Sequence, residues 1–257
     1  MKITRDIPYN PSAGVRGLGD AFMPDRRFGH PVLLIHGGGW NNLSKESIEP
    51  MAKRLAEHGR AVFSINYRLL GQAPWPACGD DCLAAGRFLL DGQVPGIDRA
   101  DKILIAGASA GGHLAMMTGL GLPAKQVEAI LSMAGPSLLD FPDGSSSRLD
   151  SAGFRQAFFG AADEPTPQQV ASVSPAKLVK AGAPPLFLIH SKNDRLVTPT
   201  HSQAAYDAWI GHGNKAQLIW FNGPGEAHGF WDSNDHATRQ PILEVVAAFE
   251  KVLRSLA

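Results

Sequence analysis

Apolar runs alternate along the chain with stretches in which apolar residues recur every three or four positions. Six runs have the length and continuity of strands buried on both faces of a sheet: residues 31–36, 61–66, 103–106, 127–133, 185–190 and 216–221. Helical spacing occupies the stretches between and after them: residues 47–59, 80–90, 113–117, 199–210 and 236–256. This alternation predicts an α/β protein with a mostly parallel sheet that is covered by helices on both faces.

Two segments interrupt the alternation. In residues 1–30, prolines and glycines break any long element, which predicts an entry segment with short edge strands. Residues 135–184 also carry many prolines, glycines and serines, around a short apolar patch at 154–160 that can form a helical turn. A segment of this length between two strands is typically a functional cover. We therefore expect a single domain over residues 1–257 with a lid-like insertion at about 136–175.

A serine lies where the run 103–106 meets the next helical stretch. Residues 107–111 read Gly-Ala-Ser-Ala-Gly, a G-x-S-x-G pattern centred on Ser109. Such a turn strains the serine backbone, holds the hydroxyl out at the carboxyl end of the sheet, and requires small flanking residues because strand and helix nearly touch. A glycine-rich turn without chemistry is the alternative. The strand before the pattern and the helix after it favour a catalytic nucleophile.

A serine hydroxyl is a poor nucleophile at neutral pH, so it needs a base and an acid that orients the base. In such a sheet these groups lie in loops at the carboxyl ends of strands, in the chain order serine, acid, histidine. Asp194 follows the run 185–190 and His228 follows the run 216–221, which predicts Asp194 as the acid and His228 as the base. The alternative role of Asp194 is an Asx-turn. Glu226 is the rival acid, but it is too close in sequence to His228 to orient the ring easily.

Glycines after the first buried run complete the constellation. That run ends in His-Gly-Gly-Gly-Trp, where a glycine backbone can aim N–H groups toward the oxyanion formed in acyl transfer. We expect the donors to be the N–H groups of Gly38, Gly39 and Ala110, the last being the residue after the serine. A plain glycine turn is the alternative. His36 and His113 are expected to be structural, with rings that anchor nearby backbone.

Composition narrows the possible partners. The 257 residues carry 24 Lys plus Arg and 24 Asp plus Glu, so no basic stripe points to nucleic acid. No apolar run reaches the roughly 18 residues of a membrane span, and the N-terminus lacks an apolar signal core. We therefore expect a cytoplasmic protein, with secretion after removal of a leader left open. A monomer and a homodimer are both compatible with the sequence.

The two cysteines, Cys78 and Cys82, would share one face of a helix. This spacing is more typical of two small packed residues than of a disulfide, and two cysteines are too few for a disulfide framework. The chain contains no H-E-x-x-H or EF-hand pattern. The sequence therefore predicts no metal and no cofactor.

Together these motifs resemble those of α/β-hydrolase esterases. The residues that carry the resemblance are 36–40, 107–115, Asp194 and 226–230. They are similar to the motifs of bacterial carboxylesterases, a group that includes feruloyl and acetylxylan esterases and has kynurenine formamidase as a near relative. The hormone-sensitive-lipase group shares the glycine motif, but it usually has Asp where this chain has Ala108. That group also carries a helical cap for which the N-terminal segment is too short. The resemblance therefore favours the capless esterases.

The resemblance implies an α/β-hydrolase fold, with a mostly parallel sheet of eight strands and helices on both faces. It also implies a serine carboxylesterase that hydrolyses short-chain or aryl esters through an acyl-enzyme. Ser109, Asp194 and His228 would form its triad, and a small-molecule ester would be its partner. An arylformamidase or other amidase would use the same residues. A non-catalytic binding protein on the same scaffold would typically have lost one of the three.

Further residues are less specific candidates for a role in the site or the fold. Four aromatic residues are candidates for an apolar acyl or aryl pocket, with core packing as the alternative: Trp40, Phe158, Phe159 and Trp231. Tyr67 and Arg68, followed by Asp81, match the family's tyrosine-arginine pair and acid-led helix. We interpret Arg68 and Asp81 as a structural salt bridge.

Overall fold

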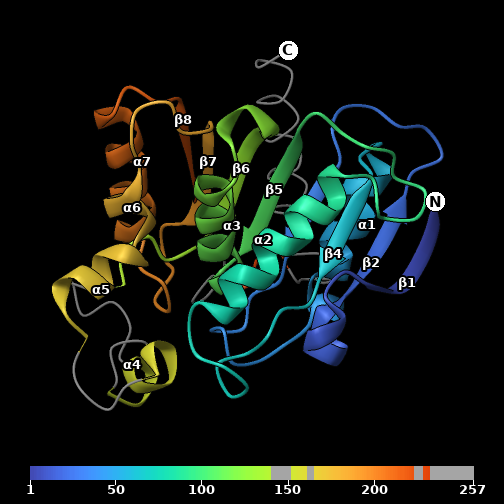
Figure 1. The fold of residues 1–257 in the computed structure, drawn as a ribbon. Coiled ribbons are helices and arrows are strands. Elements are labelled where there is room, and N and C mark those ends of the chain that lie inside the picture. Colours follow the sequence, from blue (N-terminus) through green and yellow to red (C-terminus); the bar gives the residue numbers. More distant parts are fainter. Residues whose placement is uncertain (140–151, 161–164, 223–227, 232–257) are drawn as a thin grey trace.

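The computed structural model describes residues 1–139, 152–160, 165–222 and 228–231. These residues form one sheet of eight strands in the order β1-β2-β4-β3-β5-β6-β7-β8 (Figure 1). The strands are β1 (Lys2–Pro8), β2 (Leu18–Met23), β3 (Val32–Ile35), β4 (Val62–Ile65), β5 (Ile103–Ala108), β6 (Val127–Met133), β7 (Leu186–Ser191) and β8 (Ala216–Phe221). Strand β2 pairs antiparallel with both of its neighbours, and all other pairs are parallel. The expected eight-stranded, mostly parallel sheet is confirmed.

Alternate residues of the central strands enter two separate cores. Leu33 of β3 and Ile105 of β5 belong to the core under α2 (Ala77–Leu90), α3 (Ala110–Gly121) and α7 (Thr200–Gly211). Leu34 and Leu104 belong to the core that α1 (Glu49–Glu57) covers. Successive side chains of a strand point to opposite faces, so the continuous apolar runs fill both cores. Figure 1 shows α2 and α3 on the near side of the sheet.

Three helices lie between β6 and β7: α4 (Ala152–Phe159), α5 (Pro167–Ser172) and α6 (Pro175–Leu178). The first corresponds to the expected helical turn, whereas the other two were not expected because their prolines were interpreted as breaks. Proline is tolerated at the first helical position, where its missing N–H would have no partner in any case. Thr166 and Gln169 form a capping box at the start of α5, with bonds of 2.8 and 3.2 Å. That pair was the signal for a helix.

Of the remaining expectations about the fold, two are confirmed and one lies outside the described residues. Cys78 and Cys82 are both free and buried in α2, and burial raises the pKa of the Cys78 thiol to about 12, so the interpretation as packed residues is confirmed. Arg68 and Asp81 form a two-pronged salt bridge, with Nε to Oδ2 at 2.9 Å and Nη2 to Oδ1 at 2.8 Å, as interpreted. The helix expected at 236–256 lies outside the described residues.

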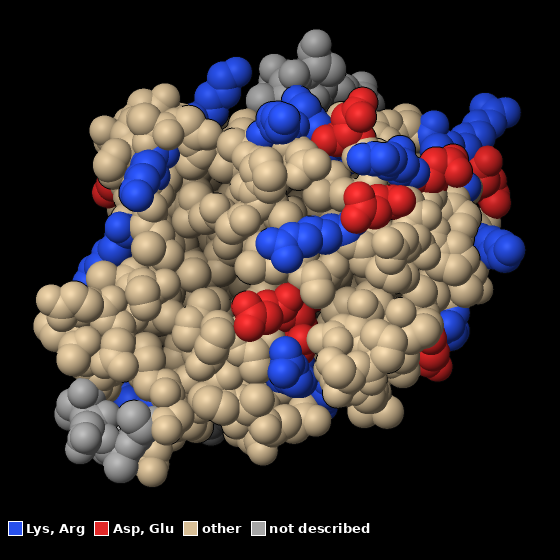
Figure 2. All heavy atoms as spheres, viewed as in Figure 1, with Lys and Arg blue, Asp and Glu red and all other residues tan. Residues whose placement is uncertain are grey.

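The described part of the chain contains no helix that is both long and apolar enough to cross a membrane. On the face that carries α2 and α3, Figure 2 shows acidic and basic side chains beside one another toward the side of β1 and β2. The surface over α4 and α5 is largely uncharged in the same view. The less charged surface therefore lies at the end of the molecule that carries α4 and α5 (Figure 1).

Candidate active site

Ser109 occupies the turn between β5 and α3. Its backbone is in a left-handed conformation with φ 53° and ψ −124°, and its N–H donates to the carbonyl oxygen of Met133 at 2.8 Å. A Cβ on Gly107 would overlap the carbonyl oxygen of Gly111, and a Cβ on Gly111 would overlap that of Ile35. Glycine at both positions therefore allows the strand and the helix to approach closely enough to hold the serine in this strained turn.

His228 connects Ser109 to Asp194. Its Nε2 lies 3.0 Å from Oγ of Ser109, and its Nδ1 lies 2.6 Å from Oδ2 of Asp194. A carboxylate only accepts hydrogen bonds, so Nδ1 carries the proton and Nε2 is free to accept the serine O–H. The imidazole is 13% exposed and packs edge-on against Trp231 at a centroid distance of 5.1 Å. The ring thus has one defined orientation with Nε2 directed at the serine.

Asp194 is held by backbone groups on one side and by histidine on the other. Its Oδ1 accepts the N–H groups of Leu196 at 2.9 Å and Val197 at 3.0 Å, so the Asx-turn proposed as an alternative is present together with the contact to His228. Burial would raise the pKa of Asp194, but hydrogen bonds from His190 and His228 outweigh it and lower the pKa to about 2. The carboxylate is therefore ionised throughout the neutral pH range.

His190 was not identified from the sequence. Its Nε2 lies 3.2 Å from the same Oδ2 of Asp194 that His228 contacts. The signal in the sequence was its place at the end of a buried run, four residues before the acid. That place alone does not distinguish a ring that faces the acid from one that faces the core.

The glycine loop after β3 lies against the serine. A Cβ on Gly37 would be 3.2 Å from Cβ of Ser109. Gly38 and Gly39 both have positive φ, 107° and 59°, and a Cβ on Gly38 would overlap the carbonyl oxygen of Asn42. Ala110 is the first residue of α3, so its N–H has no acceptor within the helix. Gly38, Gly39, Ser109 and Ala110 all line one cavity.

Aromatic stacking anchors the start of this loop. The Tyr67 hydroxyl lies 3.1 Å from the carbonyl oxygens of both His36 and Gly37, and the His36 ring stacks on Tyr67 at a centroid distance of 4.3 Å. Nδ1 of His36 lies 2.6 Å from the carbonyl oxygen of Gly37, so this nitrogen is the donor. Burial lowers the pKa of His36 to about 4, and the ring is neutral at pH 7.

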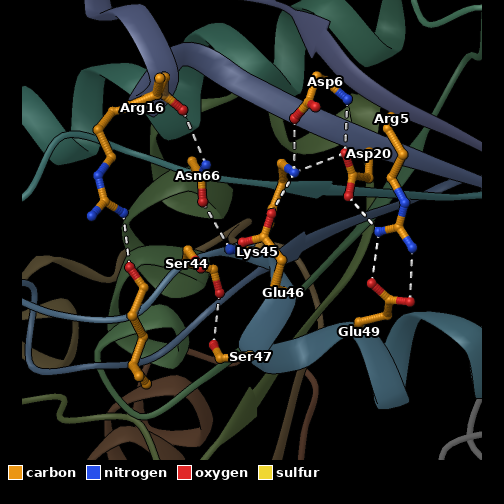
Figure 3. A network of polar contacts seen from close by, with 12 residues as sticks. Arg5, Asp6, Arg16, Asp20, Ser44, Lys45, Glu46, Ser47, Glu49 and Asn66 are labelled. Atoms are coloured by element: carbon orange, nitrogen blue, oxygen red, sulfur yellow. Dashed lines mark hydrogen bonds and ion pairs between the residues drawn. The ribbon is translucent and has the colours of Figure 1, made fainter.

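A network of charged side chains holds the end of the same loop (Figure 3). Lys45 is 4% exposed, and its Nζ lies 3.1 Å from Asp6, 3.0 Å from Asp20 and 2.7 Å from Glu46. Its backbone N–H donates to Oδ1 of Asn66 at 2.7 Å. Because Asp6 and Asp20 belong to β1 and β2, this network ties the loop to the edge of the sheet.

The cavity at Ser109 has a volume of about 590 Å³, within the range typical of small-molecule sites. Its wall is mainly apolar. Besides Ser109 and the glycine loop, the lining residues include Trp40, Leu70, Phe154, Ala157, Leu196 and Trp231. The described residues include no group of three or more His, Cys, Asp or Glu side chains that could hold a metal ion.

Two of the expected pocket residues, Trp40 and Trp231, line the cavity, whereas Phe158 and Phe159 do not. Phe158 is fully buried and stacks on Trp75 at a centroid distance of 5.6 Å. Phe159 packs against the same core. The helical turn of α4 directs Phe154 and Ala157 to the cavity and the next residues away from it, which corrects the expectation for those two phenylalanines.

Comparison with known proteins identifies the family. The BD-FAE family model matches residues 20–209, which include the glycine loop, Ser109 and Asp194. The chain belongs to the BD-FAE family. His228 lies beyond the matched range.

Curated relatives of this BD-FAE chain are named as esterases. It is 28% identical to esterase LipQ of Mycobacterium tuberculosis over 264 residues, which cover 97% of the chain and 62% of LipQ. It is 30% identical to esterase LipC of the same organism over 237 residues, which cover 85% of the chain and 57% of LipC. The chain therefore spans about three fifths of the length of these relatives.

Solved structures share the whole architecture of the BD-FAE chain. A truncated carbohydrate esterase from gut microbiota superposes with a TM-score of 0.81 at 21% identity, covering 99% of this chain and 97% of that one. Esterase B of Lactobacillus rhamnosis gives a TM-score of 0.81 at 22% identity, covering 99% and 87%. These likenesses confirm the expected α/β-hydrolase fold.

Proposed function

We propose that the chain is a serine carboxylesterase that hydrolyses small esters through an acyl-enzyme. The observation that carries this proposal is the continuous hydrogen-bonded chain from Ser109 through His228 to Asp194. Membership of the BD-FAE family and the esterase names of the relatives support it. A binding protein on this scaffold would have no need of all three groups in register.

The proposed reaction begins when Oγ of Ser109 attacks the ester carbonyl while Nε2 of His228 takes the serine proton. The resulting oxyanion is stabilised by the N–H groups of Gly38, Gly39 and Ala110, and Asp194 stabilises the imidazolium. Collapse of the intermediate breaks the bond to the alcohol oxygen, which leaves with the proton from His228. A water molecule then attacks the acyl-enzyme with His228 as base, and the acid is released.

The substrate class follows from the shape and the wall of the cavity. A volume of about 590 Å³ with mostly apolar lining suits a short acyl chain or an aryl group. Phe154 and Ala157 of α4 form part of its wall, which supports the proposal that this helix of the expected insertion at 136–175 covers the site. Residues 140–151 and 161–164 of the insertion lie outside the described residues. The same wall suits an ester and an amide, and the two substrate classes differ in which of them is turned over faster.

The test combines labelling with turnover. A fluorophosphonate probe should label the protein once, and Ser109→Ala should abolish labelling and lower turnover of nitrophenyl butyrate by about 10⁵- to 10⁶-fold. Ser172→Ala, at an exposed serine of α5, is the matched control and should change neither. Labelling that survives in Ser109→Ala would assign the nucleophile to another residue. Faster turnover of N-formylkynurenine than of methyl ferulate and nitrophenyl esters would replace the esterase by an amidase.

A further inference from the structure

Asp194 lies at the centre of a symmetric chain of five residues. On one side, its Oδ2 faces His228 at 2.6 Å, and His228 faces Ser109 at 3.0 Å. On the other side, the same Oδ2 faces Nε2 of His190 at 3.2 Å, and Nδ1 of His190 faces Oγ of Ser202 at 2.7 Å. The order is therefore serine, histidine, aspartate, histidine, serine.

Hydrogen-bond partners assign the proton on the second histidine. Nε2 of His190 lies within reach of two acceptors, the carbonyl oxygen of Val197 at 2.8 Å and Oδ2 of Asp194 at 3.2 Å. Neither can donate, so Nε2 carries the proton. Nδ1 faces the hydroxyl group of Ser202, which can donate to it and so favours the tautomer with the proton on Nε2.

The two arms of the chain differ in exposure. His190 and Ser202 are both fully buried, whereas His228 is 13% exposed and lines the cavity with Ser109. A substrate in the cavity can therefore touch only the first arm. Any effect of His190 on the reaction has to pass through its two partners, the carboxylate of Asp194 and the backbone of Val197.

The carboxylate is restrained at both oxygens. Oδ1 accepts hydrogen bonds from the N–H groups of Leu196 and Val197. Oδ2 contacts Nε2 of His190 and Nδ1 of His228. His190 also fixes the loop that carries Asp194. Its Nε2–H donates to the carbonyl oxygen of Val197, the residue whose N–H donates to Oδ1 of Asp194. Loss of His190 would free Oδ2 on one side and release the loop that carries the acid.

We propose that His190 and Ser202 are positioning residues that hold Oδ2 of Asp194 toward His228. Ser202 selects the tautomer of His190, and His190 fixes the carboxylate and the loop at Val197. This inference rests on the proposed function, since it requires Asp194 to orient the catalytic base.

The test compares three variants in steady-state kinetics. His190→Leu should lower kcat by about tenfold to a hundredfold, the equivalent of one hydrogen bond to a charged group, with KM unchanged. His190→Gln keeps an N–H at the distance of Nε2 and should recover most of the loss. Ser202→Ala leaves the ring in place and should lower kcat by about threefold to tenfold, as expected for a neutral hydrogen bond. Ser202→Ala also provides the readout if His190→Leu does not fold.

His212 supplies the control, because it is an exposed histidine just after α7, and His212→Leu should leave kcat and KM unchanged. Equal losses in His190→Leu and His190→Gln, a change confined to KM, or full activity of Ser202→Ala would overturn the inference. Ser109→Ala separates the two proposals. If it is inactive while the His190 variants keep the wild-type kcat, only the inference fails, and if it remains active, the proposed function fails.

Discussion

The indole N–H of Trp40 donates a hydrogen bond to Nδ1 of His113 at 3.2 Å. The opposite nitrogen of that ring, Nε2, donates to the carbonyl oxygen of Val173 at 2.8 Å. His113 lies in the first turn of α3, so one buried ring joins the glycine loop, the helix behind Ser109 and the chain between α5 and α6. Burial lowers the pKa of His113 to about 4, and the neutral ring can accept on one side and donate on the other.

Removing the indole donor should therefore cost both stability and turnover. Trp40→Phe leaves Nδ1 of His113 buried without its donor, which should lower the free energy of unfolding by about 1–3 kcal/mol. It should also lower kcat for nitrophenyl butyrate by about tenfold, a change of 1.4 kcal/mol in the barrier, because Trp40 forms a wall of the cavity beside Gly39. Urea unfolding and steady-state kinetics measure the two effects.

Trp209→Phe is the matched control for this prediction. Its indole N–H donates to the carbonyl oxygen of Pro184 at 2.9 Å, and the residue is as buried as Trp40 but does not line the cavity. It should lose stability and keep kcat. Equal kcat values in the two variants would show that Trp40 contributes only packing.

Asp194→Asn should lower kcat by about 10⁴-fold with the fold intact. The two backbone N–H groups at Oδ1 require an oxygen there, so the new amide N–H₂ faces His228. His228 must then accept at Nδ1 and carry its proton on Nε2, where it cannot take the proton of Ser109. Circular dichroism checks the fold and initial rates check the loss.

Glu226→Gln tests the rival acid, which lies outside the described residues. We expect it to change kcat far less than Asp194→Asn does. A larger loss in Glu226→Gln would transfer the role of the acid to Glu226.

Acyl chain length should produce an optimum in kcat/KM. Each methylene that enters the cavity gains about 0.8 kcal/mol of apolar burial, or about a fourfold rise in kcat/KM. We expect a rise from acetyl to about butyryl or hexanoyl nitrophenyl esters and a fall for decanoyl and longer esters, because the chain outgrows the cavity. Initial rates across the series from two to sixteen carbons measure the optimum.

Two variants of α4 test whether the cavity sets this optimum. Ala157 lines the cavity, whereas the neighbouring Gln156 does not. Ala157→Trp should shift the optimum to shorter chains, and Gln156→Trp should leave it unchanged. An optimum at twelve carbons or more in the wild type would contradict the small-cavity interpretation and indicate a lipase.

The stability of the fold should fall as the pH drops from about 6.5 to 4. His36 and His113 have their pKa lowered from 6.5 to about 4 by burial, so the unfolded chain binds more protons than the folded one in this window. Stability is then fully present above pH 6.5 and decreases by up to about 1.4 kcal/mol per pH unit for each ring. Urea unfolding at several pH values measures the slope.

Replacing one of the two rings checks the cause of that slope. His36→Leu should reduce the pH dependence to that of His113, at a cost in overall stability. His212→Leu, at an exposed ring, should leave the slope unchanged. A free energy of unfolding that is constant between pH 7 and 5 would contradict the assignment of both rings as neutral.

The sequence by itself determined the features that depend on neighbouring residues. The strained turn at Ser109 needs Gly107 because the carbonyl oxygen of Gly111, a few residues further along the chain, occupies the space of a side chain. The buried strands were predictable for a similar reason, since a strand covered on both faces must be apolar at every position. Local rules also contained the capping pair Thr166 and Gln169, although the prolines beside it obscured the helix.

Only the tertiary structure decided which side chains meet across long separations. His228 lies 119 residues from Ser109, and the two come together because β5 and β8 end at the same edge of the sheet. His190 is distinguished from the buried His36 and His113 by the direction of its ring toward Asp194, and Phe158 is distinguished from Phe154 by the face of α4 that it occupies. Those directions are set by the packing of elements that are distant in sequence, so no local pattern contains them.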